Sequence, residues 1–196
     1  MRIVFGNPRR STRTPGIFLD RDGVINHRIA GSYVLDWSQF VFIPGIREAL
    51  KQLAALHLPI IVVSNQACVG RGLLAPSSLE DITAKMHQTL SSDGAPLAAA
   101  YYCTHSREDN CECRKPKPAL LLRAANEFGL DLHRSIFVGD SNTDVEAAEA
   151  AGCRPILFGL NPDACLTTLR PNLATAPDAG FLFEIATKCL PASFEG

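Results

Sequence analysis

The chain has 196 residues, of which 46% are hydrophobic, and its 19 Lys and Arg against 20 Asp and Glu give a formal net charge of −1. This length suffices for one domain with a substantial core, and the balanced charge excludes a strong general attraction to nucleic acid or membrane surfaces. No apolar run reaches the roughly 18 residues of a transmembrane helix, and the first fifteen residues lack the apolar core of a secretory signal. Seven cysteines, an odd number, fit a reducing compartment better than a disulfide framework. We therefore expect a cytoplasmic protein, monomeric by default.

The chain begins with an arm, residues 1–16, whose arginines and prolines predict a loose segment or a brief edge strand. The apolar run 17–19 follows and is typical of a strand buried on both faces of a parallel sheet. It ends in Asp20 and Asp22, which point to the same side of an extended chain because side chains alternate along it. An isolated Asp-x-Asp pair more often caps a turn, so the later segments decide between capping and chemistry.

Residues 26–42 show no helical period and contain several aromatic side chains, and we expect this loop to cover a substrate. Apolar periodicity then predicts helices that begin after Pro44-Gly45, at Pro76 with a capping box from Ser77 to Glu80, after Pro118, and at a cap formed by Ser141 or Asn142. Apolar runs predict strands at residues 59–64, 98–102, 135–140 and 154–158.

Strands that alternate with helices imply βαβ units joined by right-handed crossovers. The predicted fold is therefore α/β: a doubly wound, Rossmann-like parallel sheet with helices on both faces. No large insertion follows the first strand, so the cap over the site should be minimal. Residues 17–196 are expected to form a single domain, although no element is assigned to the tail from residue 161.

Polar residues end or follow each of these strands. Ser64 ends the second strand, Lys115 lies in the loop after the third, and Asp140 with Asp144 follows the fourth. Ligands of open α/β sheets bind at the carboxyl ends of the strands, so these residues should meet the first acid pair. Singly, Ser64 could be a turn hydroxyl, Lys115 a surface charge and Asp144 a helix-terminal acid. Together they are hard to explain without a shared site.

A second cluster comprises Cys103, His105, Cys111 and Cys113, three thiols and one imidazole that match the ligand set of a tetrahedral structural zinc site. Their one-residue spacers are tighter than the common spacing of zinc ligands. Ordinary buried thiols beside a surface histidine are therefore the alternative. The cluster leads directly to Lys115, so a bound zinc ion would order the loop that presents this lysine.

The four strand-end motifs, in this order over about residues 17–158, resemble the haloacid dehalogenase superfamily of phosphatases. The resemblance implies hydrolysis of a phosphomonoester, with Asp20 as the nucleophile that forms an aspartyl phosphate and Asp22 as general acid and base. It also implies that Ser64 and Lys115 hold phosphoryl oxygens.

The same resemblance implies two metal cofactors, Mg²⁺ and Zn²⁺. Mg²⁺ would be held by Asp20, Asp140 and the backbone carbonyl of Asp22, with zinc in the cysteine and histidine cluster. Asp144 would orient Lys115 or a metal-bound water.

More narrowly, the segments Asp-Arg-Asp-Gly-Val-Ile-Asn, Ser-Asn-Gln, Cys-x-His and Cys-x-Cys-Arg-Lys-Pro-Lys-Pro look like the family of D-glycero-D-manno-heptose 1,7-bisphosphate phosphatases. They are also similar to the histidinol-phosphate phosphatases, which share the zinc loop. The implied reaction is removal of the 7-phosphate from the heptose bisphosphate. Hydrolysis of histidinol phosphate or another small metabolite is the alternative. An alternative of a different class is a non-catalytic, zinc-stabilised phosphosugar-binding domain, which need not keep the catalytic residues together.

Substrate contacts are expected from four polar residues near these motifs: Arg21, Asn65, Gln66 and Arg114. A guanidinium at residue 114 suits a second phosphate or a sugar hydroxyl, whereas the alternative is a solvated partner of Glu112. Ser141 stands where these relatives typically have Lys or Arg, which removes one expected contact. We also expect the rim at residues 26–33 to be slightly longer than in the heptose enzymes.

Overall fold

The computed structural model describes residues 1–6, 13–159, 170 and 172–191, so parts of the arm and of the tail lie outside the described residues. The strands are β1 (Arg2–Val4), β2 (Ile17–Leu19), β3 (Ile60–Asn65), β4 (Ala99–Cys103), β5 (Ile136–Gly139), β6 (Arg154–Phe158) and β7 (Ala174–Ala176). The α-helices are α1 (Ile46–Ala54), α2 (Ala67–Gly70), α3 (Pro76–Ser92), α4 (Ala119–Phe128), α5 (Asn142–Ala151) and α7 (Ala179–Cys189). Two short 3₁₀ helices are η1 (Trp37–Gln39) and η2 (Leu132–Arg134).

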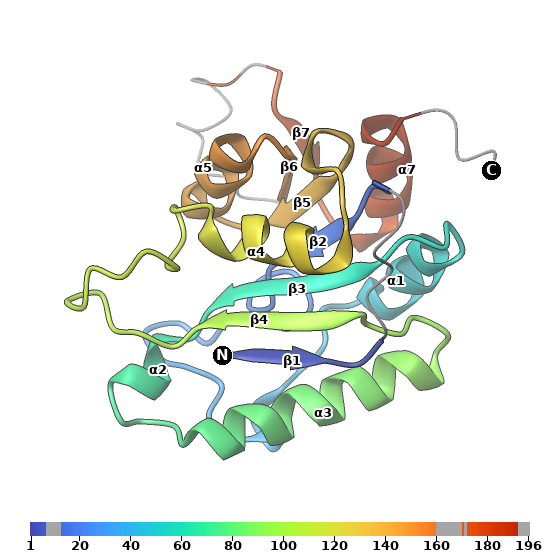
Figure 1. Cartoon of the computed structure of the whole chain (residues 1–196). Helices are drawn as coiled ribbons and strands as arrows, with labels where there is room; N and C mark the ends of the chain where they lie inside the picture. The colour runs from blue at the N-terminus through green and yellow to red at the C-terminus, as the bar shows by residue number, and fades with distance from the viewer. Residues whose placement is uncertain (7–12, 160–169, 171, 192–196) are drawn as a thin grey trace.

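The described strands form one sheet in the order β1-β4-β3-β2-β5-β6-β7. All neighbouring strands are parallel except β1, which pairs antiparallel with β4. From β2 the chain winds outward through β3 and β4, then returns to the other side of β2 and continues through β5, β6 and β7. Figure 1 shows β3 and β4 side by side with their arrowheads at the same end, where the loop from β4 to α4 leaves the sheet. The predicted doubly wound α/β fold is confirmed, and its topological switch point lies at β2.

Two hydrophobic clusters sandwich the sheet. The first cluster contains the strand side chains on one face of the sheet together with residues of α1, α3 and α7. The second contains the strand side chains on the other face together with residues of α4 and α5. Within β2, Phe18 faces the second cluster whereas Ile17 and Leu19 face the first, as alternation along a strand requires. The sheet is therefore covered on both faces, and its carboxyl edge remains the place for polar chemistry.

The helix stripes predicted from periodicity are buried, as Leu79, Ile82, Met86 and Leu90 of α3 illustrate. The predicted capping box at the start of α3 is wrong, because Ala75 is the N-cap and makes no side-chain capping bond while proline occupies the first turn. Proline favours this position since it lacks the N–H that a cap would have to satisfy.

The N-cap of α5 and the two ends of the described chain add to what the sequence predicted. At α5 the cap is Ser141, one of the two residues considered. The beginning of the arm forms β1, the edge-strand alternative. Strand β7 and helix α7 lie in the tail to which no element had been assigned.

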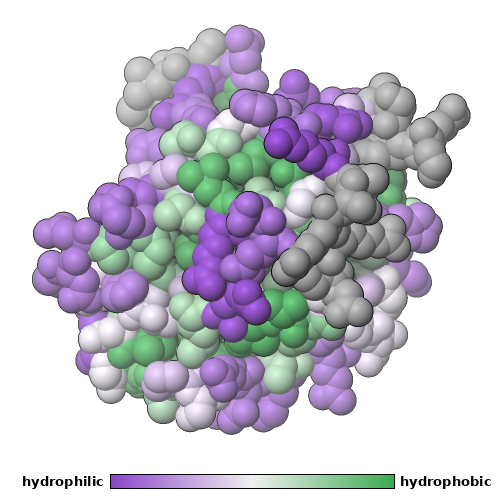
Figure 2. Space-filling model, viewed as in Figure 1, coloured by the Kyte–Doolittle hydropathy of each residue, from purple (hydrophilic) through white to green (hydrophobic). Residues whose placement is uncertain are grey.

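Hydrophilic and hydrophobic residues are intermixed over the face drawn in Figure 2. Large exposed hydrophobic side chains among the described residues come from separate segments: Val4, Val41, Leu73, Leu122 and Phe181. Within the described ranges no helix is both long and apolar enough to span a bilayer. The apolar side chains of the elements are thus collected mainly in the two interior clusters.

Ser135 connects the amino ends of the two central strands β2 and β5 through its side chain. Its buried hydroxyl accepts a hydrogen bond from the Gly16 N–H at 2.8 Å and donates to the Asp131 carbonyl at 2.6 Å. Ser135→Ala should lower the free energy of unfolding by about 1–3 kcal/mol, because a buried N–H loses its partner. Urea denaturation measures this change. Ser92→Ala, which removes an exposed hydroxyl that bonds only within α3, should change stability by less than about 0.5 kcal/mol.

Candidate active site

The carboxyl ends of β2, β3 and β5 surround a cavity of about 460 Å³. Its walls include all four predicted catalytic residues, Asp20, Asp22, Ser64 and Lys115, the predicted supporting residue Asp144, and the expected substrate contacts Asn65 and Arg114. The parallel register of the three strands brings residues separated by more than a hundred positions to one edge. The strand-end residues predicted to converge therefore do so.

Lys115 lies at the centre of the cluster with only 4% of its surface exposed. Its ammonium group is 3.0 Å from Asp20 Oδ1, 2.5 Å from Asp144 Oδ1, and donates a hydrogen bond to the Val63 carbonyl at 3.0 Å. Burial alone would lower the pKa of Lys115, but the charges of Asp144 and Asp20 outweigh it and raise the pKa above its usual value. The lysine therefore remains positively charged inside the protein.

The loop that carries Lys115 is clipped to the end of β3. The Asn65 side chain accepts a hydrogen bond from the Lys115 N–H at 3.1 Å and donates one to the Lys115 carbonyl at 3.2 Å. This two-way amide contact mimics strand pairing and fixes where the lysine backbone enters the site. Asn65 thus contacts the loop backbone while also facing the cavity.

Asp20 is buried beside this lysine, and burial raises the pKa of its carboxyl group despite the opposing effect of Lys115. One of its oxygens accepts a hydrogen bond from the Arg21 N–H at 2.8 Å. Asp20 is therefore held in one orientation, with its charge facing a cavity rather than bulk solvent.

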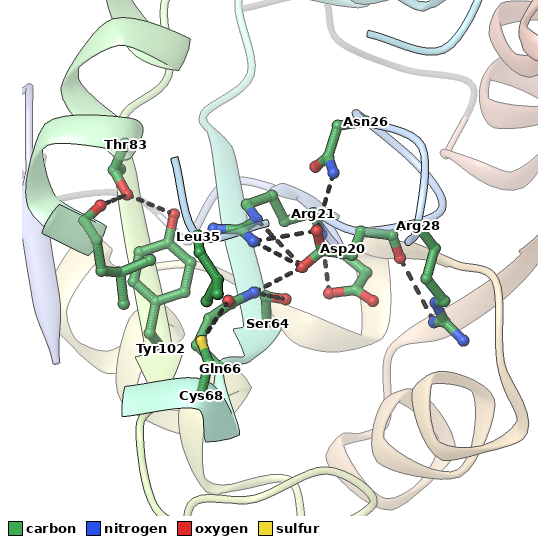
Figure 3. A network of polar contacts seen from close by, with 12 residues as sticks. Asp20, Arg21, Asn26, Arg28, Leu35, Ser64, Gln66, Cys68, Thr83 and Tyr102 are labelled. Carbon is green, nitrogen blue, oxygen red and sulfur yellow. Dashed lines mark hydrogen bonds and ion pairs between the residues drawn. The ribbon is translucent and has the colours of Figure 1, made fainter. Parts of the chain in front are cut away.

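Asp22 is clamped by the side chains of Arg21, Asn26 and Gln66, which Figure 3 draws within one network of polar contacts. Arg21 donates from Nε at 3.1 Å and Nη2 at 3.0 Å, Asn26 donates at 2.8 Å, and Gln66 donates at 2.7 Å. Burial by itself would raise the pKa of Asp22, but the Arg21 charge and these hydrogen bonds lower it below its usual value. The clamp fixes the direction of this carboxylate and favours its charged form.

The same contacts correct two sequence-based expectations. Arg21 is fully buried and Gln66 is 1% exposed, and neither side chain lines the cavity. Both were expected to touch substrate, yet their polar groups are directed to Asp22 instead. A polar residue beside a catalytic acid can serve that acid rather than the ligand, and the sequence alone does not distinguish these cases.

Carboxylate oxygens of Asp20, Asp140 and Asp144 lie within 4.8 Å of one another, an all-oxygen donor set that fits Mg²⁺. Burial, followed by repulsion from Asp20, raises the pKa of Asp140 to about 7. A divalent cation would relieve this repulsion. Both oxygens of Asp144 already have partners in Lys115 and Ser141, which suits a supporting position better than direct ligation. Asp20, Asp140 and the carbonyl of Asp22 remain the residues that would hold the cation.

Two glycines allow these acids to approach. Gly23 has a φ of +96°, and a Cβ built there would stand 1.8 Å from Asp140 Oδ2. At Gly139 a Cβ would stand 2.2 Å from the Asp144 Cβ. Any larger residue at either position would displace a carboxylate of the site.

The second cluster is also assembled, with ligand atoms of Cys103, His105, Cys111 and Cys113 within 4.8 Å of one another. The sulfur of Cys111 is 3.5 Å from that of Cys103 and 3.6 Å from that of Cys113, and His105 Nδ1 is 3.2 Å from the Cys113 sulfur. A tetrahedral zinc ion with Zn–S bonds of about 2.3 Å spaces its sulfur ligands roughly 3.8 Å apart. The four groups therefore fit a zinc ion.

Arg114 connects this cluster with the cavity. Its guanidinium donates to the His105 carbonyl at 3.5 Å and lines the cavity wall. Glu112, its alternative partner, instead pairs with Lys117 at 2.8 Å. Arg114 is thus available to the cavity rather than held by Glu112.

Several cavity residues had not been predicted individually as site residues. They are Arg28, Ile29, Ser32, Tyr33, Val34, Arg107, Asn142 and Thr143. Most belong to the long loop after β2, which had been expected to cover a substrate but gave no signal for individual residues. An arginine in an irregular loop has neither periodicity nor a motif to mark it.

Carboxylates gathered around a buried lysine at the switch point of a doubly wound sheet define the class, a haloacid dehalogenase-like phosphatase. A family model described as HAD-hydrolase-like matches residues 112–161. The chain is 40% identical to D-glycero-alpha-D-manno-heptose-1,7-bisphosphate 7-phosphatase of Mycobacterium tuberculosis over 149 residues, which are 73% of this chain and 78% of the relative. It is 36% identical to the D-glycero-beta-D-manno-heptose-1,7-bisphosphate 7-phosphatase of Pseudomonas aeruginosa over 72% of this chain and 79% of that protein. The chain belongs to the family of heptose-1,7-bisphosphate 7-phosphatases.

A solved structure supports the same relationship. The D,D-heptose 1,7-bisphosphate phosphatase of B. bronchiseptica, complexed with magnesium and phosphate, aligns with a TM-score of 0.78 and 31% identity. The alignment covers 87% of this chain and 97% of that protein. The fold and the family thus agree.

Gly23→Ala should test the close approach of Gly23 to Asp140. The substitution should lower the free energy of unfolding by about 3 kcal/mol or more, because it combines a strained backbone with a steric clash. Gly31→Ala is the matched control, since its φ is +68° but nothing lies within 4 Å of the added Cβ. The control should cost only about 1 kcal/mol. Urea denaturation of both variants checks the difference, and equal losses would contradict the steric argument.

Proposed function

We propose that this chain is a Mg²⁺-dependent phosphatase that removes the 7-phosphate of D-glycero-D-manno-heptose 1,7-bisphosphate. The observation that carries the proposal is the convergence of Asp20, Asp22, Lys115 and Asp140 at one edge of the sheet. Relatives at 36–40% identity carry the name of this activity. Because those relatives are named for different anomers, we leave the preferred anomer to the experiment below.

In the proposed reaction an oxygen of Asp20 attacks phosphorus, the P–O bond to the sugar breaks, and Asp22 gives its proton to the departing sugar oxygen. A water molecule then attacks the phosphorus of the aspartyl phosphate and gives a proton to Asp22, which releases inorganic phosphate and restores Asp20. Lys115 and Ser64 would bind the phosphoryl oxygens, whose charge must be stabilised in the transition state. Mg²⁺ held by the acids would neutralise the charges of the nucleophile and of the phosphate.

The clamp around Asp22 suits this double role. Its lowered pKa in the free protein favours the carboxylate that accepts a proton from water. A phosphate dianion bound beside it adds negative charge and would raise that pKa, so proton uptake would accompany substrate binding. Arg21, Asn26 and Gln66 act in this proposal as positioning residues, because they contact Asp22.

We further propose that zinc occupies the cluster of Cys103, His105, Cys111 and Cys113 and orders the loop that carries Arg114 and Lys115. The ligand spacing supports this role. Thiols that bind a metal must stay reduced, and no disulfide joins the cysteines of the described residues. These features support a cytoplasmic location, and we take a monomer as the working state.

Asp20→Asn should reduce Mg²⁺-dependent phosphate release by about a thousandfold or more, because an amide is a far weaker nucleophile than a carboxylate. The assay should include both heptose 1,7-bisphosphate anomers, histidinol phosphate and common sugar phosphates. Asp81→Asn, an exposed acid on α3, is the matched control and should retain activity. Circular dichroism should confirm that both variants are folded.

Phosphate release by the Asp20→Asn variant at the rate of the unaltered protein would refute the assignment of the nucleophile. Preference for histidinol phosphate would leave the mechanism intact and change the substrate. Absence of turnover on every substrate would favour the non-catalytic phosphosugar-binding alternative.

Elemental analysis should find close to one zinc ion per chain, and Cys111→Ser should lose it. Because the loop that carries Lys115 would then lack its metal, the variant should also melt at a lower temperature and hydrolyse more slowly. Cys153→Ser provides a control for loss of a buried thiol outside the cluster. A zinc-free protein with full stability and activity would contradict the zinc proposal.

A further inference from the structure

Arg28 reaches the catalytic site from the loop after β2. Its Nη2 lies 2.6 Å from Asp140 Oδ1 and 3.5 Å from the backbone carbonyl oxygen of Asp22. In Figure 3 this guanidinium approaches from the side opposite to Arg21. The side chain is 54% exposed, in contrast to the buried Arg21.

The two groups that Arg28 contacts are the same two that, with Asp20, would hold the cation. An arginine and a divalent cation cannot both take the same Asp140 oxygen without strong repulsion at this distance. An exposed ion pair contributes little stability, so a cation held by several carboxylates should displace the arginine. Arg28 is therefore placed to supply positive charge when the cation is absent and to move when the cation binds.

The displaced guanidinium would stay beside the cavity. Tyr33, five residues further along the same loop, accepts a hydrogen bond from Arg71 of the segment after α2 at 3.1 Å. This contact ties the loop to the body of the protein, so rotation of the Arg28 side chain suffices. Arg28 also lines the cavity together with Arg107 and Arg114.

Among the described residues that line the cavity, those at the start of α5 are uncharged except Asp144, and Arg170, which donates to Asn142 Oδ1 at 3.3 Å from outside the lining, is paired with Glu149. The start of α5 contributes Ser141, Asn142 and Thr143, which offer hydroxyl and amide groups but no cation. A second phosphate on the substrate would need positive charge at the rim, since the catalytic lysine and the metal serve the reacting phosphate. Arg28 can supply that charge next to Ser141, because its present partner Asp140 directly precedes Ser141.

We propose that Arg28 is a specificity-determining residue, which pairs with Asp140 while the cation is absent and, once the cation is bound, contacts the non-reacting phosphate of a bisphosphorylated sugar. The contact with the non-reacting phosphate, the substrate half of this inference, rests on the proposed function. The competition between Arg28 and the cation for Asp140, the metal half, can be measured without turnover.

The test compares Arg28→Gln and Arg28→Lys with the unaltered protein. Arg47→Gln is a matched control, because Arg47 is 50% exposed and is also 2.6 Å from an aspartate, Asp93, outside the cavity. Calorimetric titration with Mg²⁺ alone should show about two- to fivefold tighter binding to Arg28→Gln, which no longer competes for Asp140. Arg47→Gln should bind Mg²⁺ as the unaltered protein does.

The substrate half uses heptose 1,7-bisphosphate and heptose 7-phosphate, which differ only in the non-reacting phosphate. The ratio of kcat/KM for the bisphosphate to that for the monophosphate should fall about tenfold or more in Arg28→Gln, mainly through KM. Arg28→Lys, which keeps the charge but not the planar guanidinium, should give a ratio between those of Arg28→Gln and of the unaltered protein. The ratio for Arg47→Gln should match that of the unaltered protein.

Unchanged Mg²⁺ affinity in Arg28→Gln would overturn the inference, whatever the substrate. An equal fall for both substrates would also overturn it, because that result indicates a structural role. If the unaltered protein binds Mg²⁺ but hydrolyses neither compound, the proposed function fails and the specificity role of Arg28 fails with it. A lower ratio with tighter Mg²⁺ binding supports the inference.

Discussion

The buried ammonium group of Lys115, held between Asp20 and Asp144, is the interaction on which the site depends. A charge removed from water is tolerated only when partners at short range compensate the lost hydration. The compensation comes from Asp20 at the end of β2, the Val63 carbonyl of β3 and Asp144 of α5. The two ion pairs therefore also fix the relative positions of β2, the β4–α4 loop and α5. Fold and chemistry therefore share one constraint.

Around that lysine the acids outnumber the buried cations that face the cavity, and this excess of negative charge favours the binding of a cation. Asp140 shows it most directly, since burial and the neighbouring Asp20 raise its pKa to about 7. The pKa of Asp22 is lowered instead, because the charge of Arg21, which does not line the cavity, lies against it. Asp20 and Asp22, with a single residue between them, also differ: burial raises the pKa of Asp20, whereas Arg21 and its neighbours lower that of Asp22, and these surroundings suit different chemical roles.

Local sequence patterns were sufficient to predict elements and their buried faces where a single periodicity dominates. The apolar run of β2 and the stripe of α3 predicted their own burial, and the order of strand ends predicted that Asp20 and Lys115 meet. The same patterns failed at α7, where the exposed Phe181 blurs the apolar stripe, and at β7, whose sequence Ala-Thr-Ala has no large apolar side chain.

Orientation was a separate difficulty. Arg21 follows a catalytic acid in sequence, but only the packing around it reveals that its side chain is turned into the core. The position of Arg28 depends on an irregular loop, for which neither period nor propensity applies.

The clip between Asn65 and Lys115 joins two segments fifty residues apart, and Asp140 adds a third segment more than a hundred residues from Asp20. Such non-local contacts cost more chain entropy than local ones, because long loops must close before the contacts can form. A chain in which β5 has not yet paired with β2 would hold only part of the charge cluster. Catalytic competence should therefore be a property of the completely folded chain alone.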